Sequence, residues 1–153
     1  MNFSEKKIRA MLIMEVLGRP PEHIVETLEI LIKQIGEEKG TKVLNKKINS
    51  PVLLKDQKDF YTSFAEIEVE LDDILTIVIL MFKYMPANIE IISPENISIP
   101  NAGWNDILNE ITRRLHGYDE IARVMQIEKN VLENKIKELL SEKRETKSKK
   151  KKN

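Results

Sequence analysis

Three glutamates, Glu66, Glu68 and Glu70, alternate with apolar residues and are the carboxylates whose spacing best suits a bound cation. Side chains two residues apart in a strand point to the same face, so the three would form one acidic row. A metal site needs further ligands that converge on the ion, and the sequence offers neither an EF-hand spacing nor a paired histidine. We therefore interpret the row as a solvated strand face and expect no metal site.

Other groups that commonly carry out chemistry are sparse. The two histidines, His23 and His116, stand in a first helical turn and beside a helix end, and neither has a partner at ligand spacing. The sequence contains no phosphate loop, dinucleotide fingerprint or nucleophile elbow. It also contains no cysteine, which is compatible with a reducing compartment. We expect no enzymatic activity and no cofactor.

The charge is distributed unevenly along the 153 residues, although acids and bases are equal in number. Residues 142–153 contain seven bases and two acids, a net charge of +5, and the rest of the chain balances it. We predict a disordered basic tail over residues 143–153. Its candidate nucleic-acid contacts are Lys147, Lys149, Lys150, Lys151 and Lys152, because a lysine bound to phosphate releases counterions. The alternative is a tail that only aids solubility.

The apolar runs are too short to cross a bilayer, which needs about 20 residues. The N-terminal residues also lack the unbroken apolar stretch of a signal peptide. These features predict a soluble cytoplasmic protein that does not associate with membranes.

Hydrophobic periodicity in the first two thirds of the chain predicts the element order βαββαβ. The expected strands are 8–17, 41–48, 64–71 and 88–92, and the expected helices are 21–39 and 74–85. This order is that of the ferredoxin-like α+β sandwich, with both helices on one sheet face and the first and third strands central. We assign the domain to residues 8–93. Lysines of the second strand, Lys42 and Lys46 or Lys47, would then pair with the glutamate row.

The second predicted helix is apolar all round, which is more than one sheet face can bury. We consider Ile77, Leu80 and Met81 candidate interface residues. Either the C-terminal part of the same chain covers this helix, or a second molecule does.

A connector of residues 93–103 leads to a C-terminal helical segment, residues 101–142. Apolar spacing predicts a helix from Trp104 that stops at Gly117, followed by a helix from Asp119 to about Lys143. This second, long helix could pair with the first as a hairpin, or with a second copy as a short coiled coil whose seam Glu128 and Lys129 interrupt. The candidate interface residues of this segment are Trp104, Ile121, Met125, Leu132 and Ile136.

Residues 118–140 also resemble a helix-turn-helix. Ala122 stands where that motif keeps a small residue, but Gln126 replaces the turn glycine. Phosphates would also repel three glutamates of the second helix, Glu128, Glu133 and Glu138. The alternative function is therefore a DNA-binding transcriptional regulator with a ferredoxin-like sensor domain.

Two stretches, Glu-Val-Leu-Gly-Arg-Pro-Pro-Glu at 15–22 and Pro-x-x-Ile-Glu-Ile-Ile-x-Pro-Glu at 86–95, resemble an uncharacterised family of small archaeal-type proteins. The resemblance covers most of residues 8–140 and implies no activity, cofactor or catalytic residue. Our first functional hypothesis is a non-enzymatic interaction or oligomerisation module. Its partners would be a second copy or another protein, with RNA, ribosome or DNA contacted through the basic tail.

Overall fold

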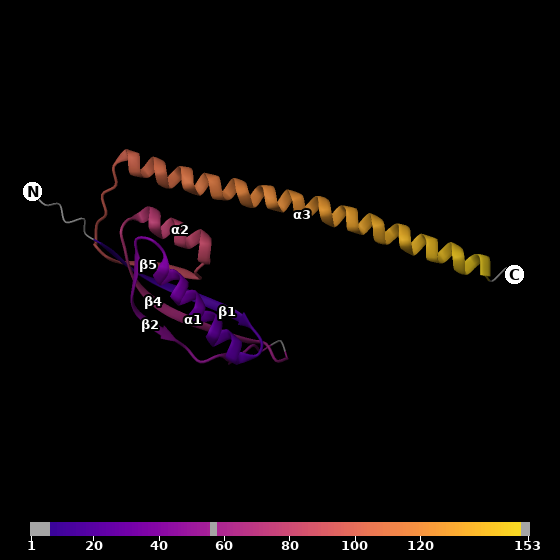
Figure 1. Ribbon diagram of the computed structural model, residues 1–153, viewed down its shortest axis with the longest axis horizontal. Helices are drawn as coiled ribbons and strands as arrows, with labels where there is room; N and C mark the ends of the chain where they lie inside the picture. The colour runs from indigo at the N-terminus through magenta and orange to yellow at the C-terminus, as the bar shows by residue number, and fades with distance from the viewer. Residues whose placement is uncertain (1–6, 56–57, 151–153) are drawn as a thin grey trace, which may run out of the picture. The chain divides into compact units, whose positions relative to one another are not determined.

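The structure, a computed structural model, describes residues 7–55 and 58–150, with side chains described as far as Lys143. The elements run β1 (Ile8–Gly18), α1 (Pro21–Glu37), β2 (Thr41–Ile48), β3 (Val52–Leu53), β4 (Tyr61–Leu71), α2 (Ile74–Tyr84), β5 (Asn88–Ser93) and α3 (Asn101–Lys150) (Figure 1). The chain forms two compact units, residues 1–111 and 112–153, whose boundary lies within α3.

The first unit is built on a five-stranded antiparallel sheet. The strands are ordered β2-β4-β1-β5, and the short β3 pairs with β4. The two central strands, β1 and β4, are the first and third of the four long strands that the sequence predicted. Strand β4 begins at Tyr61, earlier than the predicted Phe64, because Tyr61 pairs with Gly18 of β1 and with Leu53 of β3. Those partners are distant in sequence, so local periodicity did not reveal the extension.

Helices α1 and α2 pack on the same face of this sheet. Every second residue of β1 and of β4 points into one core, and the turns of α1 supply buried residues at intervals of four, four and three. The core residues are Ile8, Ala10, Leu12, Met14, Ala65, Ile67, Val69 and Leu71 from the sheet, and Ile24, Leu28, Ile32, Ile35, Ile77 and Leu80 from the helices. The fold class predicted from the sequence, α+β, is confirmed.

The opposite sheet face carries the glutamate row, and its charges are matched within the sheet. Lys42 lies opposite Glu70, and Lys47 lies opposite Glu66 with its Nζ 3.8 Å from Glu66 Oε1. Glu68 pairs with Arg9 of β1. The predicted cross-strand pairing is therefore confirmed, with Lys47 rather than Lys46 as the second lysine. Glu66 and Glu68 thus form ion pairs with neighbouring strands, and Glu70 faces Lys42 across the sheet.

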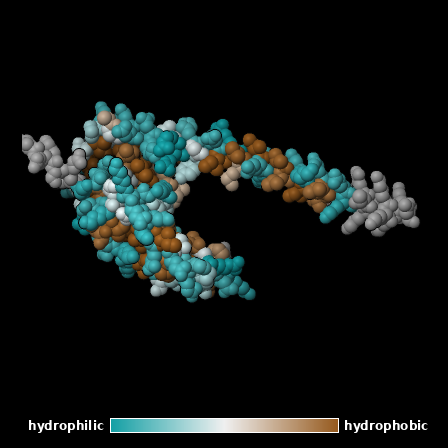
Figure 2. All heavy atoms as spheres, in the orientation of Figure 1, coloured by the Kyte–Doolittle hydropathy of each residue, from teal (hydrophilic) through white to brown (hydrophobic). Residues whose placement is uncertain are grey.

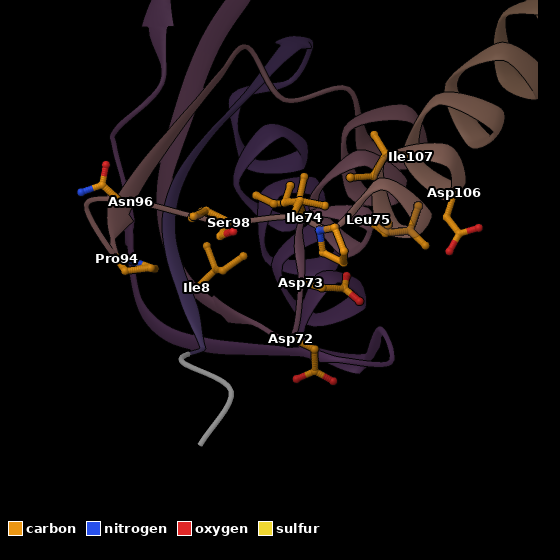
Figure 3. Close-up of a pocket in the computed structure, with 14 residues that line it drawn as sticks. Ile8, Asp72, Asp73, Ile74, Leu75, Pro94, Asn96, Ser98, Asp106 and Ile107 are labelled. Carbon is orange, nitrogen blue, oxygen red and sulfur yellow. The ribbon is translucent and has the colours of Figure 1, made fainter. Parts of the chain in front are cut away.

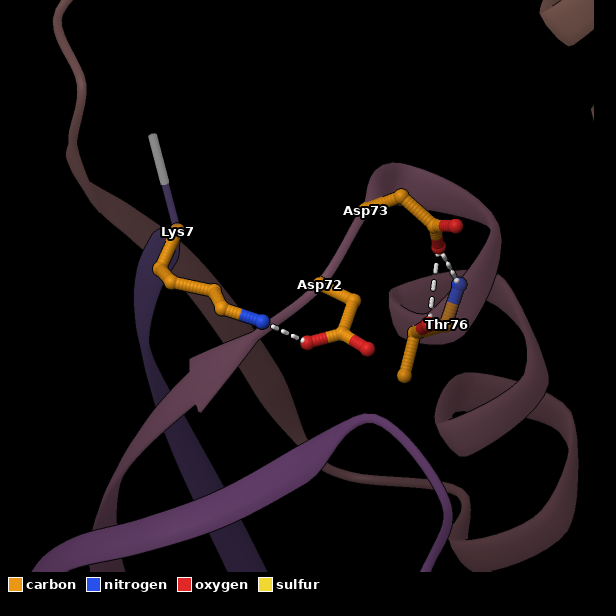
Figure 4. Close-up of polar contacts among 4 residues, drawn as sticks. All are labelled: Lys7, Asp72, Asp73 and Thr76. Carbon is orange, nitrogen blue, oxygen red and sulfur yellow. Dashed lines mark hydrogen bonds and ion pairs between the residues drawn. The ribbon is translucent and has the colours of Figure 1, made fainter. Parts of the chain in front are cut away.

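Local capping sets where α2 begins and ends. The Asp73 carboxylate accepts hydrogen bonds from the backbone N–H and the hydroxyl of Thr76, each at 2.7 Å, while the neighbouring Asp72 pairs with Lys7 (Figure 4). The helix ends at Tyr84, where Met85 takes a left-handed conformation before Pro86. Both boundaries agree to within one residue with the predicted helix, residues 74–85.

The C-terminal segment forms one helix of 50 residues, α3, which passes through Gly117 and Gln126 without a break. The predicted long helix is confirmed, although it begins at Asn101 because it does not stop at Gly117, whereas the hairpin and the helix-turn-helix are wrong. One glycine costs a helix only about 1 kcal/mol relative to alanine, and the flanking residues are mostly good helix formers. The helix also continues to Lys150, past residue 143, where we predicted disorder to begin. Residues 151–153 lie outside the described part of the chain.

Candidate interaction surface

Residues 112–143 of α3 leave many large apolar side chains exposed. Single apolar residues are common on protein surfaces, but a group of this size is not. Figure 2 shows hydrophobic side chains gathered along this helix. Their exposed fractions range from 42% to 63%, and the residues are Leu115, Tyr118, Ile121, Val124, Met125, Ile127, Val131, Leu132, Ile136, Leu139 and Leu140. An apolar face of this extent is typical of a surface that binds a partner.

A regular seam runs through these residues. Starting at Leu115, positions alternate at intervals of three and four residues, which is the 3.5-residue period of a coiled coil. The seam consists of Leu115, Tyr118, Ala122, Met125, Lys129, Leu132, Ile136 and Leu139. It has one small residue, Ala122, and one charged residue, Lys129. The seam therefore continues through Lys129, one of the two residues predicted to interrupt it.

Polar pairs along α3 flank the seam. Arg123 binds Asp119 at 2.7 Å, and Gln126 donates to Asn130 at 3.0 Å. The ammonium of Lys129 lies 3.8 Å from Glu133 Oε1, one turn further along the helix. A lysine whose charge pairs at the flank can lay its methylene stem along an apolar seam, so Lys129 is compatible with a packed interface.

The candidate residues predicted from the sequence separate into three groups. Met125, Leu132 and Ile136 lie on the seam, while Ile121 stands one residue before the seam position Ala122. Trp104 is exposed in the first unit. Ile77 and Leu80 are 7% and 1% exposed and belong to the core, so the surface of the single chain does not present them to a partner. They point toward the sheet, which the helix's uniform apolarity concealed.

The outer side of α2 is partly covered by the same chain. Val78 lies outside the main core cluster but is buried, and Ile107 of α3, in the same compact unit, is buried as well. Ile107 also lines a cavity together with Leu75 of α2. Met81 remains only partly exposed. The first turns of α3 therefore provide some of the cover that the sequence analysis required for α2.

That cavity has a volume of about 620 Å³. Figure 3 shows it lined by the start of α2, by the connector after β5 and by Asp106 and Ile107. Two of its carboxylates are already used, because Asp72 pairs with Lys7 and Asp73 caps α2. Within the described residues, no group of three or more histidines, cysteines or acids could hold a metal ion.

A smaller polar cluster joins the ends of α1 and α2. The Glu38 carboxylate accepts hydrogen bonds from Lys83 and from the Tyr84 hydroxyl, the latter at 2.5 Å. The hydrogen bond from Lys83, followed by that from Tyr84, lowers the pKa of Glu38 below 4.5. Burial and the Glu38 contact raise the pKa of Tyr84 above its usual range. Burial and contacts within the cluster explain both pKa shifts. We therefore interpret the cluster as a structural link between α1 and α2.

The lysines proposed to contact nucleic acid occupy the end of the chain. Lys147, Lys149 and Lys150 belong to the last turns of α3, where only the backbone is described, and Lys151 and Lys152 lie outside the described residues. Nucleic-acid binding therefore stays a prediction. No helix in the described ranges is long and apolar enough to span a membrane.

One family of known proteins has a model that matches most of this chain. The MJ0538 family model matches residues 9–146, which cover the sheet domain and nearly all of α3. The chain belongs to the MJ0538 family. Its membership confirms the family resemblance seen in the sequence, and the matched region ends just before the lysine run that begins at Lys147. No curated protein and no solved structure matches the chain, so the family assignment brings no activity with it.

Proposed function

We propose that this MJ0538 family member is a non-enzymatic self-association module, in which a ferredoxin-like domain carries a coiled-coil helix. The observation that carries the proposal is the exposed seam of α3, with its unbroken three-four spacing from Leu115 to Leu139. The ferredoxin-like assignment rests on the order of the long strands, with β1 and β4 central and α1 and α2 on one face.

The energetic argument is that a long helix gains most of its stability by packing an apolar face. Burial contributes about 25 cal/mol for each Å² of apolar surface removed from water. The large apolar side chains of the seam are half exposed or more, apart from Tyr118 at 42%, so a partner would bury a large part of each. A second copy offers a seam of the same spacing, and packing knobs into holes requires that match.

The proposal excludes the helix-turn-helix regulator as its alternative, since α3 has no turn at Gln126. It retains nucleic acid as a secondary partner through the basic end of the chain. The support for that part is the net charge of +5 over residues 142–153, which favours phosphate contacts without base readout.

Sedimentation velocity over about a hundred-fold range of protein concentration tests the main proposal. We expect a concentration-dependent shift from monomer to a defined oligomer, with the midpoint reporting the dissociation constant. A strict monomer across the whole range would remove self-association as the function of the seam.

A further inference from the structure

We propose that the seam of α3 pairs with the seam of a second copy in antiparallel orientation, in the register that places Leu115 of one copy against Leu132 of the other. The inference rests on the self-association proposed above and adds its orientation and register. It is argued from the two seam residues that are not large and apolar, Ala122 and Lys129.

A parallel pair in register would place each of these residues against itself. Two Ala122 side chains would leave a void in the seam, and two Lys129 side chains would place like charges in one layer. The ammonium of Lys129 already has a counter-ion on its own helix, Glu133, at 3.8 Å. At the flank, a parallel pair also brings the like-charged Glu128 and Glu133 of the two copies side by side. The parallel arrangement therefore places each of the two unfavourable seam residues, Ala122 and Lys129, against its own copy in one layer.

The antiparallel register complements both residues. Its layers are Leu115 with Leu132, Tyr118 with Lys129 and Ala122 with Met125, and each occurs twice by symmetry. The long, flexible methionine fills the space that alanine leaves. The lysine stem lies against the tyrosine ring, where its charge gains a cation–π contact while remaining at the flank near Glu133. Each of these three kinds of layer thus pairs residues of complementary size or charge, while Ile136 and Leu139 lie beyond them.

The separation of the two lysines distinguishes this register from its neighbour. Tyr118 and Lys129 are 11 residues apart, so the two Lys129 residues lie about 16 Å apart along the axis at 1.5 Å per residue. Shifting by one heptad would place Lys129 against Met125 and bring the two lysines to about 6 Å. That distance falls within the Debye length of about 8 Å at physiological salt, whereas 16 Å exceeds it.

The flanking charges do not alter this choice. The antiparallel register brings Arg114 near Lys135 of the second copy, and the parallel arrangement brings Glu128 near Glu133. Each orientation has one kind of exposed like-charge pair at its flank, and the parallel one also brings Arg114 beside Asp119 of the second copy. Exposed pairs contribute little to stability. The seam layers therefore decide the orientation.

The absence of native cysteine allows a direct test with full-length protein. Variants Leu115→Cys and Leu132→Cys are treated, alone and as an equilibrated mixture, with oxidant or a short bismaleimide. In the proposed register, identical positions lie about 25 Å apart along the axis. We expect covalent dimers only in the mixture. Ile127→Cys, equally exposed but off the seam, serves as the control and should give none.

Sedimentation of each variant separates the possible failures. If the wild-type chain is monomeric, both the proposed self-association and the proposed antiparallel register are refuted. If the chain associates but the single variants crosslink with themselves, the pairing is parallel and only the inference fails. If Leu115→Cys crosslinks with Leu139→Cys rather than with Leu132→Cys, the register is the shifted one, and the inference is again overturned.

Discussion

The substitution Leu132→Ala tests the seam most directly. Leu132 is 63% exposed in the single chain and would become buried on association. Truncating a buried leucine costs about 2 kcal/mol at the lower end of the measured range. The change occurs in both copies of a dimer, so the loss is about 4 kcal/mol, or about a thousand-fold in the dissociation constant. Sedimentation equilibrium measures this difference.

The matched control is Ile127→Ala. Ile127 has the same exposed fraction as Leu132, 63%, and lies on the same helix, but it is off the three-four seam. Its truncation should leave the dissociation constant within about three-fold of wild type, as for an exposed surface site. Equal weakening by the two substitutions would show that general apolarity, not the seam, drives association. An unchanged constant for Leu132→Ala would refute the seam itself.

Three further predictions concern the helix, the sheet domain and the tail. Gly117→Ala should raise the stability of α3 by about 1 kcal/mol, because an added Cβ meets nothing within 4 Å; circular dichroism on heating measures it, and a loss of helix would contradict it. Glu38→Gln should lower the free energy of unfolding by about 1 kcal/mol at neutral pH. Because the pKa of Glu38 is lowered in the fold, its stabilising effect is present above pH 4.5 and is lost as the pH falls through the folded value. The difference from wild type in thermal melts should therefore narrow in acid, and a constant difference would argue against the ion pair. Removing residues 143–153 should abolish binding to RNA or DNA in a salt titration; unchanged binding would exclude the tail as the contact.

The sheet domain illustrates how far local patterns carry. Alternation over β4 and the repeat of α1 are properties of neighbouring residues, so they predicted which face is buried and where the glutamates lie. The same reasoning predicted that lysines of the second strand lie beside the glutamate row, because two-residue periodicity and strand order fix which side chains share a face. The earlier start of β4 and the existence of β3 depend on pairing between distant segments, which local periodicity does not contain.

In α2 the sequence determined that the helix is apolar on all sides, but not which side faces the sheet. Ile77 and Leu80 proved to be core residues, and Ile107 supplies cover from a segment almost thirty residues away. An amphipathic helix reveals its buried face through its polar residues, and α2 has too few of them to do so.

The residues of the seam are present in the sequence, and their three-four spacing from Leu115 can be read there. Spacing defines a face only if the backbone between the residues is helical throughout. At Gly117 and at Gln126 the sequence allowed either a stop or a continuation, since local propensities there differ by only about 1 kcal/mol. In the structure the helix continues through both residues. The separate apolar positions therefore form one seam with Lys129 and Ala122 at its centre.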